Sequence, residues 1–563
     1  MNEPTRTTDR GTWGSLVLAL FAVATTVGIL SLALWNRGTS VSPDAVTYLQ
    51  TAVNFFLGRG LTMPTYHPAT DVMTSAPTTH YPPLLPFIYG LEMFVGIPSS
   101  QAPVIVSLVG WVALLSGMGV LTYRLGTSPL VAALVVALAA FYPDFWLIFS
   151  HTLSEVVFLP LLVWLHVILV DLPTRSTRKL PRLAGAAVVL ALLILTRHVG
   201  VVVLAGVLLW WGWWHLAHRQ VRWLVGGGAI LASAVLPYAL WVVANTGQTS
   251  SVAGWHFRSS DDTFIDGVAG IVESSIQALV PLTPFHGYLH HLGLATMLLL
   301  TVPYLGIFGA AGVALWRHRP ARIPLLTPYR SPLLLVLCLY LALYLVVQPF
   351  LSFTPLDNRD MTTITCLFIP WVAGALAHLL PARWASALIG GYVALNVAIT
   401  LLLPVSLRGI PAWWTTPPER VTEHPYDQSW TPFTDRFGFL AWFEFAPYKT
   451  NDLADFHPDL TTWLQSMAPG ERGEVLVLVN QPGRYLFAPH PGITIGDLQG
   501  WLDAGSCASQ YPAVVVIFDA DTVYYPEDEP PPAQLYQAVQ QKCPDLPKQV
   551  FEHSTVYQLV AEE

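Results

Sequence analysis

Long apolar stretches alternate with short polar loops over the first 404 residues of the chain. Most of these stretches hold about 20 residues with almost no charge, the length that a helix needs to cross a bilayer core of roughly 30 Å. The pattern therefore predicts about eleven membrane-spanning helices. We place them at 14–34, 103–123, 129–143, 154–170, 183–199, 200–216, 223–243, 292–316, 332–350, 362–379 and 384–404.

Basic residues gather in three of the loops between these stretches, 171–182, 217–222 and 317–330. Short loops that are rich in Lys and Arg stay on the cytoplasmic side of a membrane. Counting spans outward from these loops predicts a cytoplasmic N-terminus and an extracytoplasmic C-terminus. We therefore expect a multi-pass protein of the plasma membrane.

The first external loop, 35–102, contains two segments that we predict to be helices at the membrane surface. One begins at Pro43, a residue type favoured at the first position of a helix, and ends at Gly58 and Gly60. The other, 82–96, is apolar but short and starts with two prolines, so it is predicted to lie on or dip into the outer face. A further span there would reverse the orientation that the basic loops define.

The composition changes after residue 404. Residues 405–450 are rich in Pro and Trp and predict a linker, and residues 451–563 predict a soluble domain on the outer side. Residues 405–563 hold 21 acidic and 8 basic residues, which agrees with that side. The sequence thus predicts an all-α polytopic membrane domain over 1–404, followed by a small C-terminal extracytoplasmic α/β domain.

Local patterns support the α/β prediction for the C-terminal domain. The apolar runs Val475–Val479 and Val514–Phe518 predict buried strands, and the patterns near 459–467 and 533–542 predict helices. Cys507 and Cys543 are the two cysteines of this domain, and an oxidising compartment would favour a disulfide between them.

Overall composition narrows the functional class. Only 11% of the residues are charged, 53% are hydrophobic and the mean hydropathy is +0.51, whereas soluble domains carry roughly 25% charged residues. A large soluble core is therefore excluded. No basic patch indicates a nucleic-acid partner, and no Cys/His spacing is typical of a metal site.

Asp44 is the first candidate for chemistry. It follows the first span and lies at the start of the predicted surface helix, near the bilayer surface. A carboxylate in this place can meet a substrate that is linked to a lipid. The alternative is that Asp44 only stabilises the positive end of the helix dipole.

The order of elements around Asp44 adds a further indication. Four features follow one another: the first span, Asp44 with Tyr48, the turn Gly58-Arg59-Gly60, and the element His80-Tyr81-Pro82-Pro83. This order resembles the GT-C glycosyltransferases, in the branch that contains the protein O-mannosyltransferases and the lipid A aminoarabinose transferase. The resemblance covers roughly residues 13–404. It implies that Asp44 is catalytic and that Tyr48, His80 and Tyr81 help to bind the donor.

The resemblance also implies a second acidic residue before the fourth span. Glu155 is the best match, and Asp144 is a weaker candidate. Glu155 would position the acceptor or a metal. The alternative is that Glu155 caps a helix start beside Ser154.

Two arginines are candidates for binding the phosphate of the carrier. Arg359 precedes a helix that contains Pro370, as an Arg often does in the family, although Asp360 stands where a Tyr is common. Arg197 lies at the outer end of the fifth span. An Arg can hold a phosphate through two hydrogen bonds. Alternatively, Arg359 pairs with Asp357 or extends towards the membrane surface.

The metal requirement stays open at this point, with Mg²⁺ or Mn²⁺ as the candidate cofactor, because only some relatives in the family use one. Asp519-Ala520-Asp521 superficially resembles a DxD metal motif. It follows an apolar run on the outer side, where nucleotide sugars do not occur. We interpret it as a turn at the end of a strand.

Taken together, the resemblance implies an integral membrane glycosyltransferase. It would move a sugar from a polyprenyl-phosphate-linked donor to an acceptor glycan, lipid or protein on the outer face of the membrane. The alternatives are a polytopic transporter or lipid flippase, and a non-catalytic membrane assembly protein. Transporters usually show paired repeats and ionisable residues at mid-membrane, whereas the spans of this sequence are almost uncharged at mid-depth.

Overall fold

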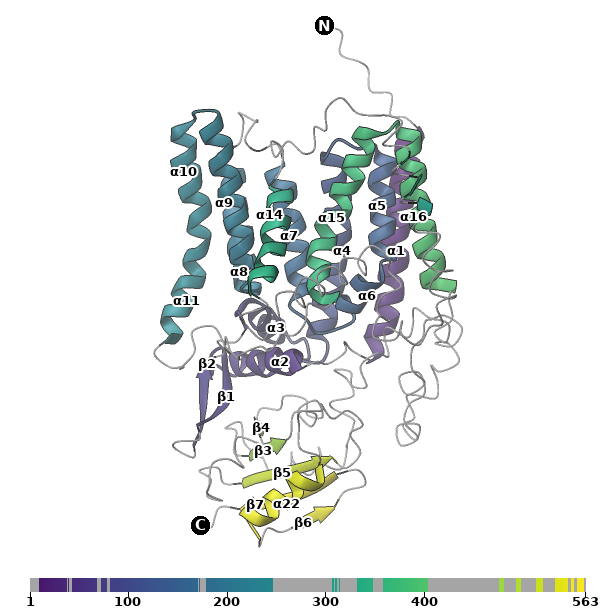
Figure 1. Cartoon of the computed structure of the whole chain (residues 1–563). Helices are drawn as coiled ribbons and strands as arrows, with labels where there is room; N and C mark the ends of the chain where they lie inside the picture. Colours follow the sequence, from purple (N-terminus) through teal and green to yellow (C-terminus); the bar gives the residue numbers. More distant parts are fainter. Residues whose placement is uncertain are drawn as a thin grey trace.

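The computed structural model places its secondary structure in two regions, a helical bundle and a C-terminal sheet (Figure 1). The structure describes residues 10–37, 39, 43–67, 72–77, 81–170, 172, 179–246, 306–307, 309–310, 313, 332–347, 358–402, 475–479, 493–497, 513–519, 532–544, 548–550 and 554–560. The predicted linker 405–450 lies outside the described residues.

Helices occupy ten of the eleven stretches that the apolar pattern predicts, and the eleventh, 292–316, lies largely outside the described residues. The bundle helices are α1 (Arg10–Arg37), α4 (Ala102–Arg124), α5 (Pro129–Ala140), α7 (Glu155–Leu169), α8 (Lys179–Thr196), α9 (Gly200–Ala217), α10 (Val221–Ala232), α11 (Leu236–Thr246), α14 (Leu333–Val347), α15 (Asn358–Leu379) and α16 (Ala382–Leu402). The 3-10 turn η1 (Ser233–Val235) joins α10 to α11. Six helical segments in the described part are long and apolar enough to cross a membrane.

The predicted span 129–143 is longer than the helix found there. Helix α5 ends at Ala140, and the short α6 (Pro143–Phe149) begins three residues later. Pro143 lacks a backbone N–H to continue the ladder of α5, and proline also disfavours helical geometry in the residue before it. The chain therefore changes direction at Tyr142, which is fully buried.

Large apolar side chains remain exposed along the outer helices of the bundle. Phe21 of α1 is 66% exposed, and Leu240 and Val243 of α11 are 69% and 72% exposed. A helix that shows apolar residues on its outward face needs a non-aqueous surrounding, which a bilayer supplies. The chain is thus a multi-pass membrane protein.

Close packing positions the start of α7 within the bundle. A Cβ at Gly110 of α4 would overlap the carbonyl oxygen of Val156, so the two backbones touch at this point. The Trp164 Nε1 atom donates a hydrogen bond to the Ala113 carbonyl oxygen at 2.9 Å. On the other side of α4, Trp111 Nε1 donates to Thr26 Oγ1 of α1 at 3.1 Å. These contacts hold α7 against α4 with little freedom to slide.

Helices α2 (Pro43–Phe56) and α3 (Leu84–Phe94) lie at one end of the bundle, where α2 runs across the bundle axis (Figure 1). Gly58 and Gly60 end the α2 segment with φ angles of 75° and 79°, a backbone region that glycine adopts at little cost. Helix α3 has 11 residues, so it reaches only about 16 Å and is too short to cross a bilayer.

A hairpin that the sequence did not predict follows α2. Strands β1 (Thr62–His67) and β2 (Val72–Pro77) pair antiparallel, with Thr62 opposite Pro77. Asn54 of α2 donates a side-chain hydrogen bond to the Thr62 carbonyl oxygen at 2.9 Å, which joins the helix to the start of the hairpin.

The C-terminal part contains a five-stranded sheet in the order β4-β3-β5-β7-β6. Its elements are β3 (Val475–Val479), β4 (Ile493–Asp497), β5 (Ala513–Asp519), α22 (Pro532–Lys542), β6 (Lys548–Val550) and β7 (Ser554–Val560). Strand β3 pairs parallel with β4 and β5, and β7 pairs antiparallel with β5 and β6. The predicted strands at 475–479 and 514–518 and the predicted helix at 533–542 correspond to β3, β5 and α22. The predicted helix at 459–467 lies outside the described residues.

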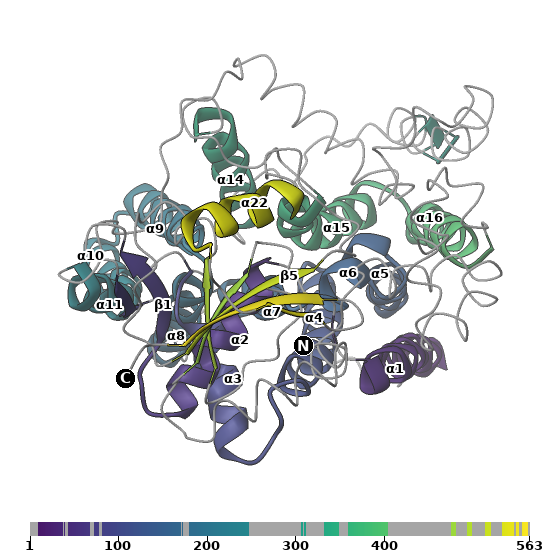
Figure 2. The same ribbon diagram turned by 90° about the horizontal axis from the view of Figure 1, so that it is seen from below.

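The sheet lies beyond the end of the bundle that carries α2 and α3 (Figures 1 and 2). Strand β1 of the hairpin contacts β4, the edge strand of the sheet. Cys543 at the end of α22 is disulfide-bonded, and its predicted partner Cys507 lies outside the described residues. In the described helices Cys338 and Cys366 are free thiols.

Candidate active site

The first turn of α2 carries Asp44. Pro43 occupies the first helical position and Asp44 the second, where the unpaired backbone N–H groups of a helix start favour a carboxylate. The backbone of Asp44 is placed in this turn, and its side chain lies outside the described part.

A hydrogen bond joins the chain before Asp44 to the chain before Glu155. The hydroxyl oxygens of Thr39 and Thr152 are 2.6 Å apart, and both side chains are fully buried. Thr39 precedes Asp44 by five residues, and Thr152 precedes Glu155 by three. A contact between residues 113 positions apart therefore brings together the two segments that carry the predicted carboxylates.

Glu155 forms an ion pair with Arg197. Glu155 is the first residue of α7 and is fully buried, while Arg197 follows the last residue of α8 and is 19% exposed. The Ser154 hydroxyl donates to Glu155 Oε2 at 3.2 Å. A carboxylate at a helix start and a guanidinium at a helix end both complement the helix dipoles. This pair thus links two of the predicted site residues where the start of α7 meets the end of α8.

Tyr48 and Tyr81 meet between α2 and the start of α3. Their rings lie edge to face with centroids 5.0 Å apart, and Tyr48 is only 2% exposed. Tyr48 is one helical turn beyond Asp44 on the same face of α2. The neighbouring His80 lies outside the described residues.

The face of α3 beside Tyr48 carries two groups that we did not predict. Tyr89 is fully buried, and no described residue forms a hydrogen bond with its hydroxyl. Burial, together with nearby Glu92 and Tyr48, raises the pKa of Tyr89 well above its usual value. Burial also raises the pKa of Glu92 from 4.5 to about 7. Glu92 is the only acidic residue in the apolar segment 82–96. A lone carboxyl group in an apolar segment could therefore have been identified as a candidate from the sequence.

Ionisation of Glu92 gives a prediction about stability. A carboxyl group whose pKa is raised on folding stabilises the fold in its protonated form, so this contribution is lost as pH rises from about 4.5 to about 7. Glu92→Gln cannot ionise. We expect the Tm of the wild type to fall more than that of Glu92→Gln between about pH 5 and about pH 8. Parallel Tm profiles, measured by thermal unfolding of the two purified proteins, would contradict this assignment.

The remaining candidates, Arg359 and Asp144, lie on α15 and α6. Arg359 is the second residue of α15, a helix that contacts α6 and α7, and its side chain lies outside the described part. His198, next to Arg197, has its Nδ1 atom 2.7 Å from the Tyr238 hydroxyl. Asp144 in the first turn of α6 is 2% exposed.

Metal binding has no support in the described part of the chain, where no three His, Cys, Asp or Glu side chains come together. A role for Mg²⁺ or Mn²⁺ therefore stays a prediction. Asp519 ends strand β5, and Ala520 and Asp521 lie outside the described residues.

Comparison with solved structures defines the class of fold. The chain has the fold of the GT-C superfamily glycosyltransferases. No protein-family model and no curated protein matches the sequence. The expected GT-C resemblance is thus confirmed at the level of the fold.

Two of the similar structures are of ArnT from Cupriavidus metallidurans. Its apo structure has a TM-score of 0.52 and 15% identity, covering 96% of this chain and 98% of that chain. ArnT bound to undecaprenyl phosphate has a TM-score of 0.53 and 13% identity, with the same coverage of 96% and 98%. The arabinofuranosyltransferase AftD from Mycobacteria has a TM-score of 0.50 and 16% identity, covering 97% of this chain but only 42% of that chain.

Proposed function

We propose that this protein transfers a sugar from a polyprenyl-phosphate-linked donor to an acceptor glycan, lipid or protein on the outer face of the membrane. The observation that carries the proposal is the convergence of the segments before Asp44 and Glu155, made by the Thr39–Thr152 hydrogen bond and continued by the Glu155–Arg197 ion pair. The same fold in ArnT is solved with undecaprenyl phosphate bound, which supports a lipid phosphate as part of the donor.

The proposed reaction assigns the proton and the leaving group to different residues. Asp44 takes the proton from the acceptor hydroxyl or amine as its oxygen or nitrogen attacks the anomeric carbon. The bond between that carbon and the phosphate oxygen breaks, and polyprenyl phosphate leaves with the electron pair. The sugar is transferred with inversion at this carbon. A positioned carboxylate is suited to such general-base work.

The other residues have binding and positioning roles in the proposal. Arg359 neutralises the departing phosphate, with Arg197 as a second cation. Glu155 positions the acceptor, or a divalent cation, while its ion pair keeps Arg197 in place. Tyr48, His80 and Tyr81 contact the donor.

The proposed topology completes this assignment. We propose eleven spans, a cytoplasmic N-terminus, and a C-terminal α/β domain on the outer side of the plasma membrane. The sheet then lies on the same side as α2 and α3, which agrees with the contact between β1 and β4.

A cysteine introduced as Gly470→Cys tests this topology. We expect a membrane-impermeant thiol reagent to label this variant in intact cells, because residue 470 belongs to the proposed outer domain. The wild type treated in parallel gives the background of its own four cysteines. Labelling that occurs only after permeabilisation would contradict the orientation.

The proposed function is tested by mass spectrometry of lipid-linked sugars and glycans in cells with and without the protein. Its loss should remove one sugar from an external glycan, lipid or protein and leave the corresponding polyprenyl-phosphate sugar unused. A flippase would instead change the distribution of a lipid between leaflets while all glycans keep their composition. Unchanged glycans and unchanged lipid-linked sugars would contradict the proposal.

A further inference from the structure

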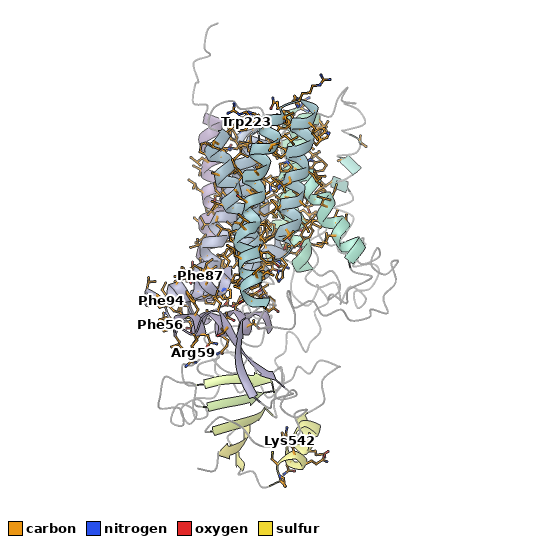
Figure 3. The ribbon with its side chains drawn as sticks, turned by 90° about the vertical axis from the view of Figure 1, so that its left-hand side faces the viewer. Phe56, Arg59, Phe87, Phe94, Trp223 and Lys542 are labelled. Atoms are coloured by element: carbon orange, nitrogen blue, oxygen red, sulfur yellow. The ribbon has the colours of Figure 1, made fainter. Side chains whose placement is uncertain are left out.

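A second polar cluster lies at the other end of the bundle from α2 and α3. It is formed by the first residue of α8, the end of α9 and the start of α10. Figure 3 shows Trp223 of α10 at this end, while Phe87, Phe94 and Arg59 lie at the opposite end. The cluster is therefore separate from the candidate active site, and its role is independent of the proposed function.

Lys179, the first residue of α8, is a buried cation. It is only 9% exposed, and no described acidic residue forms an ion pair with it. Its Nζ atom lies 5.0 Å from the centroid of the Trp223 ring. A single cation–π contact offsets only part of the cost of burying an unpaired ion. An anion beside Lys179 would offset the rest of this burial cost.

His215 on α9 offers a second unsatisfied group beside Lys179. The imidazole is fully buried, and its ring centroid is 4.2 Å from that of Trp211. Trp211 Nε1 in turn donates a hydrogen bond to the carbonyl oxygen of Trp223, the residue whose ring Lys179 contacts. Its Nδ1 atom is 2.8 Å from Gln220 Oε1, an acceptor, so Nδ1 carries the proton. The Nε2 atom then presents a lone pair, and no described residue forms a hydrogen bond with it.

The surroundings of these two side chains match the headgroup region of a bilayer. Helices α8, α9 and α10 belong to segments that can cross a membrane, and the cluster lies at their ends. Trp213 is 40% exposed there, and Trp side chains favour the membrane–water interface. Arg219 and Arg222 are exposed beside the cluster, and the positive end of the α8 dipole favours an anion. Clusters of basic residues at the ends of membrane helices attract the headgroups of anionic lipids.

We propose that Lys179 and His215 form a binding site for phosphatidylglycerol, an anionic phospholipid with a hydroxyl-bearing headgroup. The phosphate lies against the Lys179 ammonium and the start of α8. A headgroup hydroxyl donates its hydrogen bond to His215 Nε2. The lipid thereby satisfies both buried groups and holds α8 and α9 together at this surface.

Native mass spectrometry of the purified full-length protein tests the site. The protein is titrated with phosphatidylglycerol, with phosphatidylcholine and with inorganic phosphate in separate series. We expect saturable retention of one phosphatidylglycerol, and at least about tenfold weaker retention by Lys179→Gln, since a charge-assisted contact is lost. Arg383→Gln removes the same charge from an exposed residue at the start of α16 and should retain the lipid like the wild type.

Two further measurements show whether a loss of retention comes from the lipid site or from a less stable protein. In pure phosphatidylcholine, Lys179→Gln should be at least as thermally stable as the wild type, because it removes an unpaired buried charge. His215→Gln should weaken phosphatidylglycerol more than phosphatidic acid, which has no hydroxyl-bearing headgroup. Equal retention by Lys179→Gln and the wild type would overturn the site, and competition by inorganic phosphate alone would overturn the lipid as its ligand.

Discussion

Replacement of Asp44 by Asn is expected to reduce sugar transfer by about a hundred- to ten-thousand-fold, the range typical of a lost general base. The Asn side chain keeps the size and polarity of Asp44 but cannot accept a proton from the acceptor. Because the phosphate-binding residues are unchanged, the donor should still bind. The measurement is the turnover of a polyprenyl-phosphate sugar by the purified variant, with donor binding followed in parallel.

The alternative role of Asp44 predicts a different outcome for the same variant. If Asp44 only stabilised the start of α2, Asn would serve nearly as well, and the cost would be a few tenths to about 1 kcal/mol of stability. A thermal unfolding control separates the two cases. A well-folded Asp44→Asn protein with near-normal turnover would remove Asp44 from the mechanism.

Replacement of Glu155 by Gln should destabilise the protein by about 3 kcal/mol, at the lower end of the range for breaking a buried ion pair. The lower end applies because Arg197 keeps 19% exposure. The main cost is that the guanidinium at the end of α8 loses the Glu155 carboxylate. Sugar transfer should fall as well, because the segment joined to the Asp44 loop through Thr152 loses its anchor.

A double-mutant cycle identifies the origin of this loss. Glu155→Gln with Arg197→Gln removes both charges, so the double variant should recover part of the stability that either single variant loses. Unfolding of all four proteins is measured under the same conditions. Strictly additive losses would show that the ion pair does not couple the two helices.

Much of the membrane region was predictable because its signals are local. The 3.6-residue helix and the bilayer thickness together require long apolar stretches, and helices occupy ten of the eleven that we placed. Pro43, Gly58 and Gly60 likewise predicted both ends of α2, since each acts on the backbone at its own position. The predicted strands at β3 and β5 were visible as short apolar runs rich in Val.

The geometry of the site depends on contacts that no local pattern shows. Thr39 and Thr152 are ordinary threonines, and only the packing of the bundle brings their hydroxyls together. The Glu155–Arg197 pair similarly requires the start of α7 to face the end of α8. The hairpin was missed because Thr62–His67 contains a proline and no clear apolar–polar alternation.

Strand β7 was not predicted either, for a different reason. Its residues Ser554–Val560 are rich in Thr, Val and Tyr, types that favour strands. The signal was present in the sequence. Strand β4, by contrast, contains Gly496, which makes it hard to distinguish from a loop. Pairing in the sheet, and not local preference, accounts for β4.

The most direct test of the account is the reaction of the purified full-length protein with a polyprenyl-phosphate sugar in lipid vesicles that also contain an acceptor fraction from the cell envelope. We predict that one polyprenyl phosphate is released for each sugar that appears on the acceptor, and that Asp44→Asn lowers both signals together by about a hundredfold or more. Translocation of the lipid-linked sugar across the vesicle membrane, with no transfer and no release of polyprenyl phosphate, would contradict the account.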